Sequence, residues 1–154
     1  MAATRLIALH IGKGKNMAKA LTARLDYSQN PDKTDGGELI SSYECSPEIA
    51  AAEFLLSKRK YYELTGRTQQ NDVIAYQIRQ AFKPGEIMPE EANRVGYELV
   101  MRFTKGYHAF TVSTHIDKAH IHNHIIFNLT SLDCTRKFRD FKRTGLALQR
   151  VCLL

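Results

Sequence analysis

The chain has 154 residues, of which 44% are hydrophobic and 25% are charged, as in one folded domain rather than a disordered chain. No apolar run approaches the ~18 residues that a membrane-spanning helix needs, and the N-terminal residues do not form a signal-peptide pattern. We therefore expect a cytoplasmic protein without a membrane partner. The formal net charge of +6 favours a polyanionic partner, with nucleic acid the first to consider.

The pattern of apolar residues predicts eight elements in the order β-α-β-α-β-α-β-β. Strands are expected at residues 4–11, 39–43, 72–82, 107–115 and 120–130, and helices at 17–26, 47–64 and 89–104. In the third strand, Ile74, Tyr76 and Ile78 alternate with other residues and are expected on one side, together with Phe82. This order predicts an α/β (α+β) layer sandwich, in which helices pack on one face of a central antiparallel sheet of about five strands.

The C-terminal end differs from the rest of the chain. Residues 144–154 look helical and apolar, but no capping residue ends the pattern. We therefore expect residues 1–143 to form the functional domain and residues 144–154 to begin a helical segment that is cut short.

Four of the six histidines lie within ten residues, at positions 115, 120, 122 and 124. In an extended strand the last three point to the same face, and a four-residue loop at 116–119 would place His115 opposite His120. His115 would then be a diagonal neighbour of His122, within reach of long side chains. Three imidazoles that converge on one point can bind a divalent metal ion. The alternative is a set of polar side chains on a solvated sheet face.

Two other polar residues accompany the histidines. Asp117 either orients an imidazole or serves as a turn residue. Asn128, which falls on the same strand face, either bonds a phosphate or ligand or caps the strand end. A structural zinc site is disfavoured because such sites are usually rich in cysteine and no cysteine lies near the cluster. A catalytic or substrate-binding metal fits the pattern better.

The pattern His115-x-Asp117-x-x-His120-x-His122-x-His124-x-x-x-Asn128 resembles the three-histidine motif of conjugative relaxases. These mobilisation proteins belong to the HUH endonuclease superfamily, and the MOBP-type nuclease domain of bacterial plasmids and integrative conjugative elements is the most similar type. Residues 25–34, LDYSQNPDKT, resemble the tyrosine motif of the family, and residues 80–86, QAFKPGE, resemble its middle motif. The resemblance extends over residues 4–143.

The resemblance implies a nickase that cleaves one DNA strand at the transfer origin. A tyrosine hydroxyl attacks the scissile phosphate, which gives a 5′-phosphotyrosyl link and a free 3′-hydroxyl, and the reverse step rejoins the strand. A phenol with a pKa near ~10 needs activation at neutral pH. A divalent metal on the phosphate oxygens would neutralise developing charge. Mg²⁺ or Mn²⁺ is the expected ion in function, although imidazole ligands also accept Zn²⁺ or Ni²⁺.

Tyr27 is the expected nucleophile because it matches the family motif and ends a predicted helix beside a polar loop. Tyr43 is the reserve candidate. No tyrosine follows Tyr107, so the nucleophile must precede the histidines in the chain. That order resembles relaxases and differs from rolling-circle replication initiators, in which the tyrosine follows the histidines.

The family spacing selects His115, His122 and His124 as metal ligands. Strand geometry alone does not exclude His120, which would otherwise touch the phosphate or the tyrosine. Glu86, after a Pro-Gly turn, is a candidate catalytic carboxylate that either accepts the tyrosine proton or orients a ligand. A plain solvated loop acid is the alternative for Glu86.

The segment from residue 136 to residue 143 contains five basic residues interleaved with two phenylalanines. Cations can pair with phosphates while aromatic rings stack on bases, as in single-strand binding. The expected DNA-binding residues are Lys33, Arg136, Lys137, Arg139, Lys142 and Arg143. The alternative for the 136–143 segment is a solvated linker.

The leading hypothesis is therefore a metal-dependent, site-specific DNA nickase and strand transferase. A second hypothesis is a non-catalytic, metal-containing module that binds single-stranded DNA, and a third is a hydrolase of small phosphoesters. The resemblance also implies three partners: origin-of-transfer DNA in single-stranded form, an accessory relaxosome protein and a coupling protein.

Overall fold

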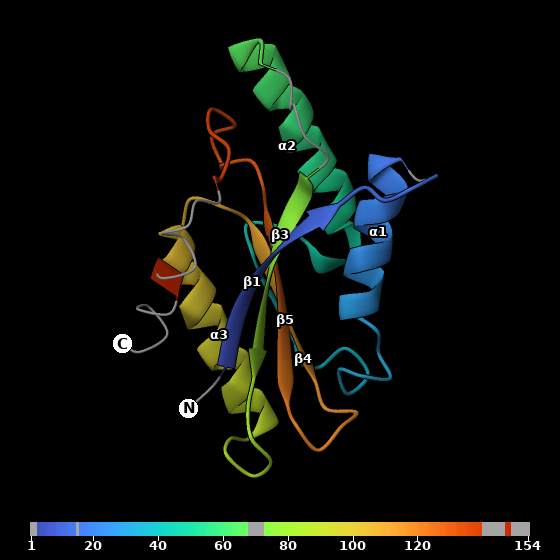
Figure 1. The fold of residues 1–154 in the computed structure, drawn as a ribbon, viewed down its shortest axis with the longest axis vertical. Coiled ribbons are helices and arrows are strands. Elements are labelled where there is room, and N and C mark those ends of the chain that lie inside the picture. The colour runs from blue at the N-terminus through green and yellow to red at the C-terminus, as the bar shows by residue number, and fades with distance from the viewer. Residues whose placement is uncertain (1–2, 15, 68–72, 140–146, 149–154) are drawn as a thin grey trace.

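The computed structural model describes residues 3–14, 16–67, 73–139 and 147–148. They form one five-stranded antiparallel sheet in the strand order β1-β3-β5-β4-β2, with helices on both faces (Figure 1). The strands are β1 (Ala3–His10), β2 (Ile40–Tyr43), β3 (Val73–Ala81), β4 (Phe110–His115) and β5 (His122–Asn128). The α-helices are α1 (Met17–Ser28), α2 (Ala50–Thr65) and α3 (Pro89–Thr104). The predicted order of elements and the antiparallel sheet are confirmed.

Each face of the sheet has its own apolar core. On one face α3 contributes Leu99, which packs in a cluster with Phe127 of β5. On the other face α1 and α2 contribute Leu21 and Phe54, which pack in a second cluster with Ile126. The expectation of helices on one face only is therefore wrong. The apolar residues at both alternating positions of β5 leave two faces that need cover.

The predicted common side of Ile74, Tyr76 and Ile78 is also wrong. The register between β1 and β3 shifts near the start of β3, which leaves Ile74 as the additional residue. Such a bulge moves the alternation of side chains by one position. Ile74 accordingly packs in the cluster under α1 and α2, whereas Tyr76 and Ile78 pack in the cluster under α3.

The hairpin of β4 and β5 has a six-residue loop, 116–121, rather than the four-residue loop predicted. As a result His115 pairs directly with His122, and Ser113 pairs with His124. The predicted pairing of His115 with His120 is wrong, and His120 lies in the loop rather than on the strand face. The two strands are also shorter than predicted, at 110–115 and 122–128.

A buried polar side chain, Asn123, fixes this hairpin register. Thr114 Oγ1 donates a hydrogen bond to Asn123 Oδ1 over 2.6 Å, and these two residues are also partners in the ladder. Asn123 Nδ2 donates to Gln80 Oε1 on β3 and to the carbonyl oxygen of Ala92 on α3, over 2.9 and 2.7 Å. A one-residue slip would leave these buried groups without partners, which is costly.

Residues in the left-handed conformation end two of the helices. Gly66 ends α2 in the left-handed conformation, with φ of 68°, and Lys105 ends α3. Before α2, however, Ser46 forms no side-chain cap, and Pro47 opens a short 3-10 turn (Pro47–Ile49) instead of the α-helix itself.

Of the predicted C-terminal helical segment, only residues 147–148 are described, and Leu148 is buried in the core under α3. Among the described residues, no helix combines the length and the apolar character that crossing a membrane would require.

The close approach of α3 to the sheet generates a prediction about Gly96. A Cβ at this position would lie 2.6 Å from Asn123 Nδ2 and 3.1 Å from Val112 Cγ1. We expect Gly96→Ala to lower the free energy of unfolding by about 1–3 kcal/mol through overpacking, although alanine is the better helix former by about 1 kcal/mol. Urea denaturation measures the change. Glu98→Ala, on the exposed side of α3, is the control and should stay within about 0.5 kcal/mol. Equal stability of Gly96→Ala and the wild type would contradict the proposed packing.

Candidate active site

A cavity of about 510 Å³ lies between α1 and the sheet face that carries the histidines. Its polar lining comes from α1, β1, β3 and the hairpin, and consists mainly of Arg24, Tyr27, His10, Gln77, Arg79, His115, His122 and His124, with Lys33, Asp117 and Lys118 at the loops. Segments far apart in the sequence thus contribute to one polar site.

Tyr27 lies in the last turn of α1, where its side chain is 56% exposed. The centroid of its ring is 6.0 Å from the ring centroids of both His115 and His124. The structure therefore brings the predicted nucleophile together with the predicted histidines. Tyr43, the reserve candidate, lies elsewhere: its hydroxyl donates to the carbonyl oxygen of Gly106, and its ring stacks on Phe110.

The rings of His115 and His124 stack, with centroids 4.0 Å apart and an angle of 28° between their planes. His115 Nε2 donates a hydrogen bond to the carbonyl oxygen of Ser28 over 2.8 Å. His124 Nδ1 lies 3.2 Å from the side-chain amide of Gln77. The orientation of both rings is thus fixed by neighbours from α1 and β3.

Burial keeps these imidazoles neutral. Desolvation, followed by the nearby charge of His115, lowers the pKa of His124 to about 3. Desolvation is also the main cause that lowers the pKa values of His115 and His122. A neutral imidazole has a lone pair for a metal ion or a proton, so the cluster is chemically suited to either.

The donor set fits a divalent metal ion in its chemistry. The Nε2–H of His115 donates a hydrogen bond to a backbone carbonyl oxygen, as metal-bound histidines usually do. The other ring nitrogen, Nδ1, is left for the ion. Ser113, the ladder partner of His124, has a buried hydroxyl without a hydrogen-bond partner among the described residues. In the arrangement of the described side chains, however, no group of three or more His, Cys, Asp or Glu residues is positioned to hold a metal ion.

Lys33 and Asp117 form an ion pair at the edge of the cavity, with 2.8 Å between Nζ and Oδ2. The hydrogen bond between the two side chains raises the pKa of Lys33 and lowers that of Asp117. Lys33 Nζ also lies 5.4 Å from the centroid of the Tyr27 ring. Asp117 therefore holds Lys33 beside Tyr27. The hydrogen bond of Asp117 is to this lysine and not to an imidazole, which was one of the two predicted roles.

Three predicted residues lie outside the cavity lining. His120 Nδ1 donates to the carbonyl oxygen of Phe82 over 3.4 Å. The carboxylate of Glu86 accepts a hydrogen bond from the backbone N–H of Lys83. Asn128 Nδ2 donates to Ser57 Oγ on α2 over 2.7 Å. These contacts place none of the three beside Tyr27, so they do not support roles in the cavity.

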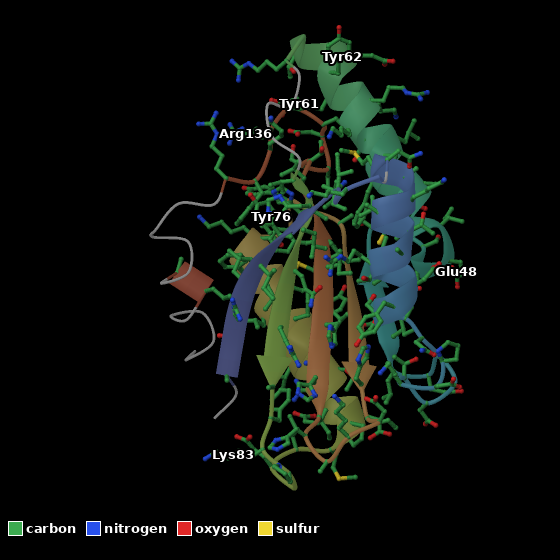
Figure 2. The ribbon with its side chains drawn as sticks, turned by 45° about the vertical axis from the view of Figure 1, so that its right-hand side comes forward. Glu48, Tyr61, Tyr62, Tyr76, Lys83 and Arg136 are labelled. Atoms are coloured by element: carbon green, nitrogen blue, oxygen red, sulfur yellow. The ribbon has the colours of Figure 1, made fainter. Side chains whose placement is uncertain are left out.

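The predicted basic segment also lies away from the cavity. Arg136 lies at one end of the sheet and Lys83 at the other (Figure 2). His122 is near the Lys83 end, because it pairs with Ala81. Arg136, Lys137 and Arg139 therefore occupy the end of the sheet opposite the histidines, and Lys142 and Arg143 fall outside the described residues.

Sequence reasoning missed two cavity residues of β3, Gln77 and Arg79. Arg79 pairs with His124 in the ladder, and its charge contributes to lowering the pKa of His115, His122 and His124. Both residues alternate with the buried Tyr76 and Ile78 in the sequence. Polar residues within a central strand were the signal that could have identified them.

The neutral histidines predict a loss of stability in acid. His115 and His124 have folded-state pKa values below that of an unfolded histidine, so the unfolded chain binds more protons below pH ~6.5. We expect the free energy of unfolding to fall as the pH falls from about 6.5 towards 5, by up to roughly 1.4 kcal/mol per pH unit for His124, with a further loss in the same direction from His115. Urea denaturation with a chelator present measures this. His124→Gln should give a shallower slope; identical slopes would contradict the assignment.

Comparison with known proteins identifies the family of the chain. The family model for relaxases, described as the MobA/VirD2-like nuclease domain, matches residues 27–153. The group II intron-interrupted relaxase LtrB of Lactococcus lactis is 32% identical over 142 residues, covering 79% of this chain and 25% of that protein. Protein rlx of Staphylococcus aureus is 32% identical over 103 residues, covering 67% of this chain and 30% of that protein. The chain thus spans a quarter to a third of the length of these relatives. On these matches, the chain belongs to the family of MobA/VirD2-like relaxase nuclease domains.

Proposed function

We propose that this chain is the strand-nicking domain of a relaxase, with Tyr27 as the nucleophile that attacks a phosphate of single-stranded DNA at the transfer origin. The observation that carries the proposal is the position of Tyr27, whose ring lies 6.0 Å from both His115 and His124 in one cavity. The phenol is exposed and at the end of a helix, so a DNA strand can reach it.

In the proposed reaction, the Tyr27 oxygen forms a bond to phosphorus and the bond from phosphorus to the 3′ oxygen breaks. The phenol loses a proton to solvent, and the leaving 3′ oxygen gains one, so the product is a 5′-phosphotyrosyl link and a 3′-hydroxyl. Lys33 Nζ, 5.4 Å from the centroid of the Tyr27 ring, would stabilise the negative charge that the reacting oxygens share in the transition state. Asp117 keeps Lys33 in that position through their ion pair.

Arg79 is the second cation in this proposal. It lines the cavity beside His124, and a guanidinium can bind two phosphate oxygens at once. Arg79 would hold the scissile phosphate against the sheet while Lys33 acts on the attacking oxygen. With Arg79 on the phosphate and Lys33 beside the attacking oxygen, the two reacting groups would be held in line for the displacement.

We further propose that His115, His122 and His124 hold a divalent metal ion after a rotation of their side chains. The bound ion would supply Lewis-acid charge to the phosphate oxygens. Three neutral imidazoles favour Mn²⁺, Zn²⁺ or Ni²⁺ over Mg²⁺ as ligands, although the ion used in cells also follows availability. The natural protein would act with origin DNA, an accessory relaxosome protein and a coupling protein, which rests on the family alone.

The nucleophile assignment predicts that Tyr27→Phe abolishes the covalent protein–DNA adduct. DNA binding should stay within about twofold, because the hydroxyl acts mainly in the transition state. The assay incubates the chain with origin-containing single-stranded DNA and Mn²⁺, and resolves the adduct by denaturing electrophoresis. Tyr62→Phe is the matched control, since Tyr62 is 54% exposed on α2 and should keep full activity.

Two outcomes would contradict this proposal. An adduct formed by Tyr27→Phe at the wild-type level would place the nucleophile elsewhere. Binding of DNA by the wild-type chain without cleavage, under all divalent ions tried, would favour the non-catalytic binding module instead.

The metal assignment makes a separate prediction with a readout independent of cleavage. We expect Mn²⁺ or Ni²⁺ to raise the melting temperature of the wild-type chain, because a ligand that binds only the folded state stabilises it by mass action. His122→Ala should lose most of that rise, and His120→Ala should keep it. Calorimetric titration then gives the stoichiometry. The same rise in the His122→Ala variant would exclude this ligand set.

A further inference from the structure

We propose a second DNA-binding site in a cavity at the end of the sheet opposite Tyr27, where a base and its phosphate bind several nucleotides away from the cleaved bond. This inference rests on the proposed function and extends it. The cavity has a volume of about 520 Å³, and the residues that carry the argument are Tyr107, His108, Leu132, Arg136, Lys137 and Phe138.

The aromatic wall of this cavity is exposed but held by a fixed backbone. Tyr107 is 64% exposed. Its N–H donates to the carbonyl oxygen of Thr104, and its own carbonyl oxygen accepts from the N–H of Leu132 over 2.8 Å. Exposing a large aromatic ring has no folding benefit, whereas a ring on a rigid backbone can stack on a nucleobase at little entropic cost.

The side chains at the floor of the cavity are already packed against one another before any ligand binds. Phe138 contacts Phe127 and Tyr76 edge to face, with ring centroids 4.9 Å apart in both pairs. His108 lies 5.9 Å from Phe138 between ring centroids, and its Nδ1 donates to the carbonyl oxygen of Asn128. The floor is therefore not expected to rearrange when a ligand enters, which favours binding.

Cationic side chains line the same cavity as Tyr107. Arg136, Lys137 and Arg139 line the cavity, and Lys137 Nζ lies 5.4 Å from the centroid of the Tyr61 ring on α2. Figure 2 shows Tyr61 and Arg136 at this same end of the molecule. Lys58 is close enough that burial, and then the charge of Lys137, lower its pKa. An anion placed here would relieve the mutual repulsion of these cations.

The acidic residue of the cavity does not offset these charges fully. The Asp133 carboxylate accepts hydrogen bonds from Ser131 Oγ and Thr135 Oγ1, each over 2.7 Å. It is thus bonded within its own loop, and this one carboxylate lines the cavity together with Arg136 and Lys137. An acidic peptide would need only the cations, whereas a nucleotide uses the exposed ring and the cations together.

The spacing of the two cavities defines which nucleotides could use the second site. Thr130 is six residues beyond His124 along the chain, or about 20 Å at ~3.3 Å per strand residue. A stacked strand advances ~3.4 Å per nucleotide, so about six nucleotides bridge that distance. The second site would therefore bind a part of the strand that the cleavage step does not touch.

Fluorescence anisotropy with oligothymidylates of two lengths tests the proposal. We expect Tyr107→Ala to weaken binding of a strand of about 24 nucleotides by roughly 5- to 100-fold, as for the loss of one stacked base. Tyr107→Phe should restore the affinity, because the ring is kept. Tyr62→Ala is the control, since Tyr62 is also an exposed tyrosine. A strand of about three nucleotides, which is too short to reach from the Tyr27 cavity to the second site, should bind all variants equally.

The contribution of the cationic side chains is measured by the salt dependence of binding. Arg136→Ala combined with Lys137→Ala should reduce the slope of log affinity against log salt by about 1.4 for the longer strand, since each phosphate contact contributes ~0.7 for single strands. Unchanged affinity of the Tyr107→Ala variant for the longer strand would overturn the proposal. An equal loss for both strand lengths would also overturn it, because that result indicates damage to the fold. Adduct formation by Tyr27 on a short origin strand is scored separately, so failure of the proposed cleavage and failure of the second site are distinguishable.

Discussion

The hydrogen bonds of Asn123 are the constraint on which the rest of the structure depends. This one side chain joins β5 to Thr114 of β4, to Gln80 of β3 and to the backbone of α3. Because neighbouring strand residues point to opposite faces, a correctly held Asn123 sends His122 and His124 into the cavity on the other face. The buried hydrogen bonds of Asn123 under α3 thus determine the geometry of the site on the opposite face of the sheet. A hydrophobic residue in its place would pack but would not select one register.

The sheet face under α1 and α2 carries both an apolar cluster and the polar cavity, which explains how polar side chains are buried there. α1 and α2 close one part of their sheet face with an apolar cluster, while the rest of that face carries charged and imidazole side chains beside the last turns of α1. Burial keeps His124 neutral, with a pKa of about 3, and the helix end leaves Tyr27 accessible. The histidines and Tyr27 are therefore held by separate elements, and they come together only when the whole sandwich is formed.

Local patterns in the sequence were sufficient for the order of the elements. The tyrosine and histidines that they singled out lie together in the fold, with the Tyr27 ring 6.0 Å from the rings of His115 and His124. They were not sufficient for pairing, because the register depends on Asn123 and on a six-residue loop rather than on turn length alone. The prediction of a single covered face was wrong because β5 has apolar residues at both alternating positions. The predicted common side of Ile74 and Tyr76 was wrong because Ile74 lies at a bulge that no periodicity reveals. Arg79 was missed because a polar residue in a central strand indicates a polar site but does not show which other residues share that site until the fold is known. The family spacing supplied the choice of histidines, which residue chemistry alone had left open.

The basic segment at 136–139 shows how composition and position answer different questions. Its charges made nucleic acid a reasonable partner, but the fold places them at the end of the sheet away from Tyr27. A cation at that distance cannot stabilise charge at the cleaved phosphate, because the interaction between exposed charges is screened beyond ~10 Å. In the proposed function these residues would therefore act on affinity and on the path of the strand. Lys33 and Arg79, with no neighbouring basic run in the sequence, line the cavity beside Tyr27 and His124.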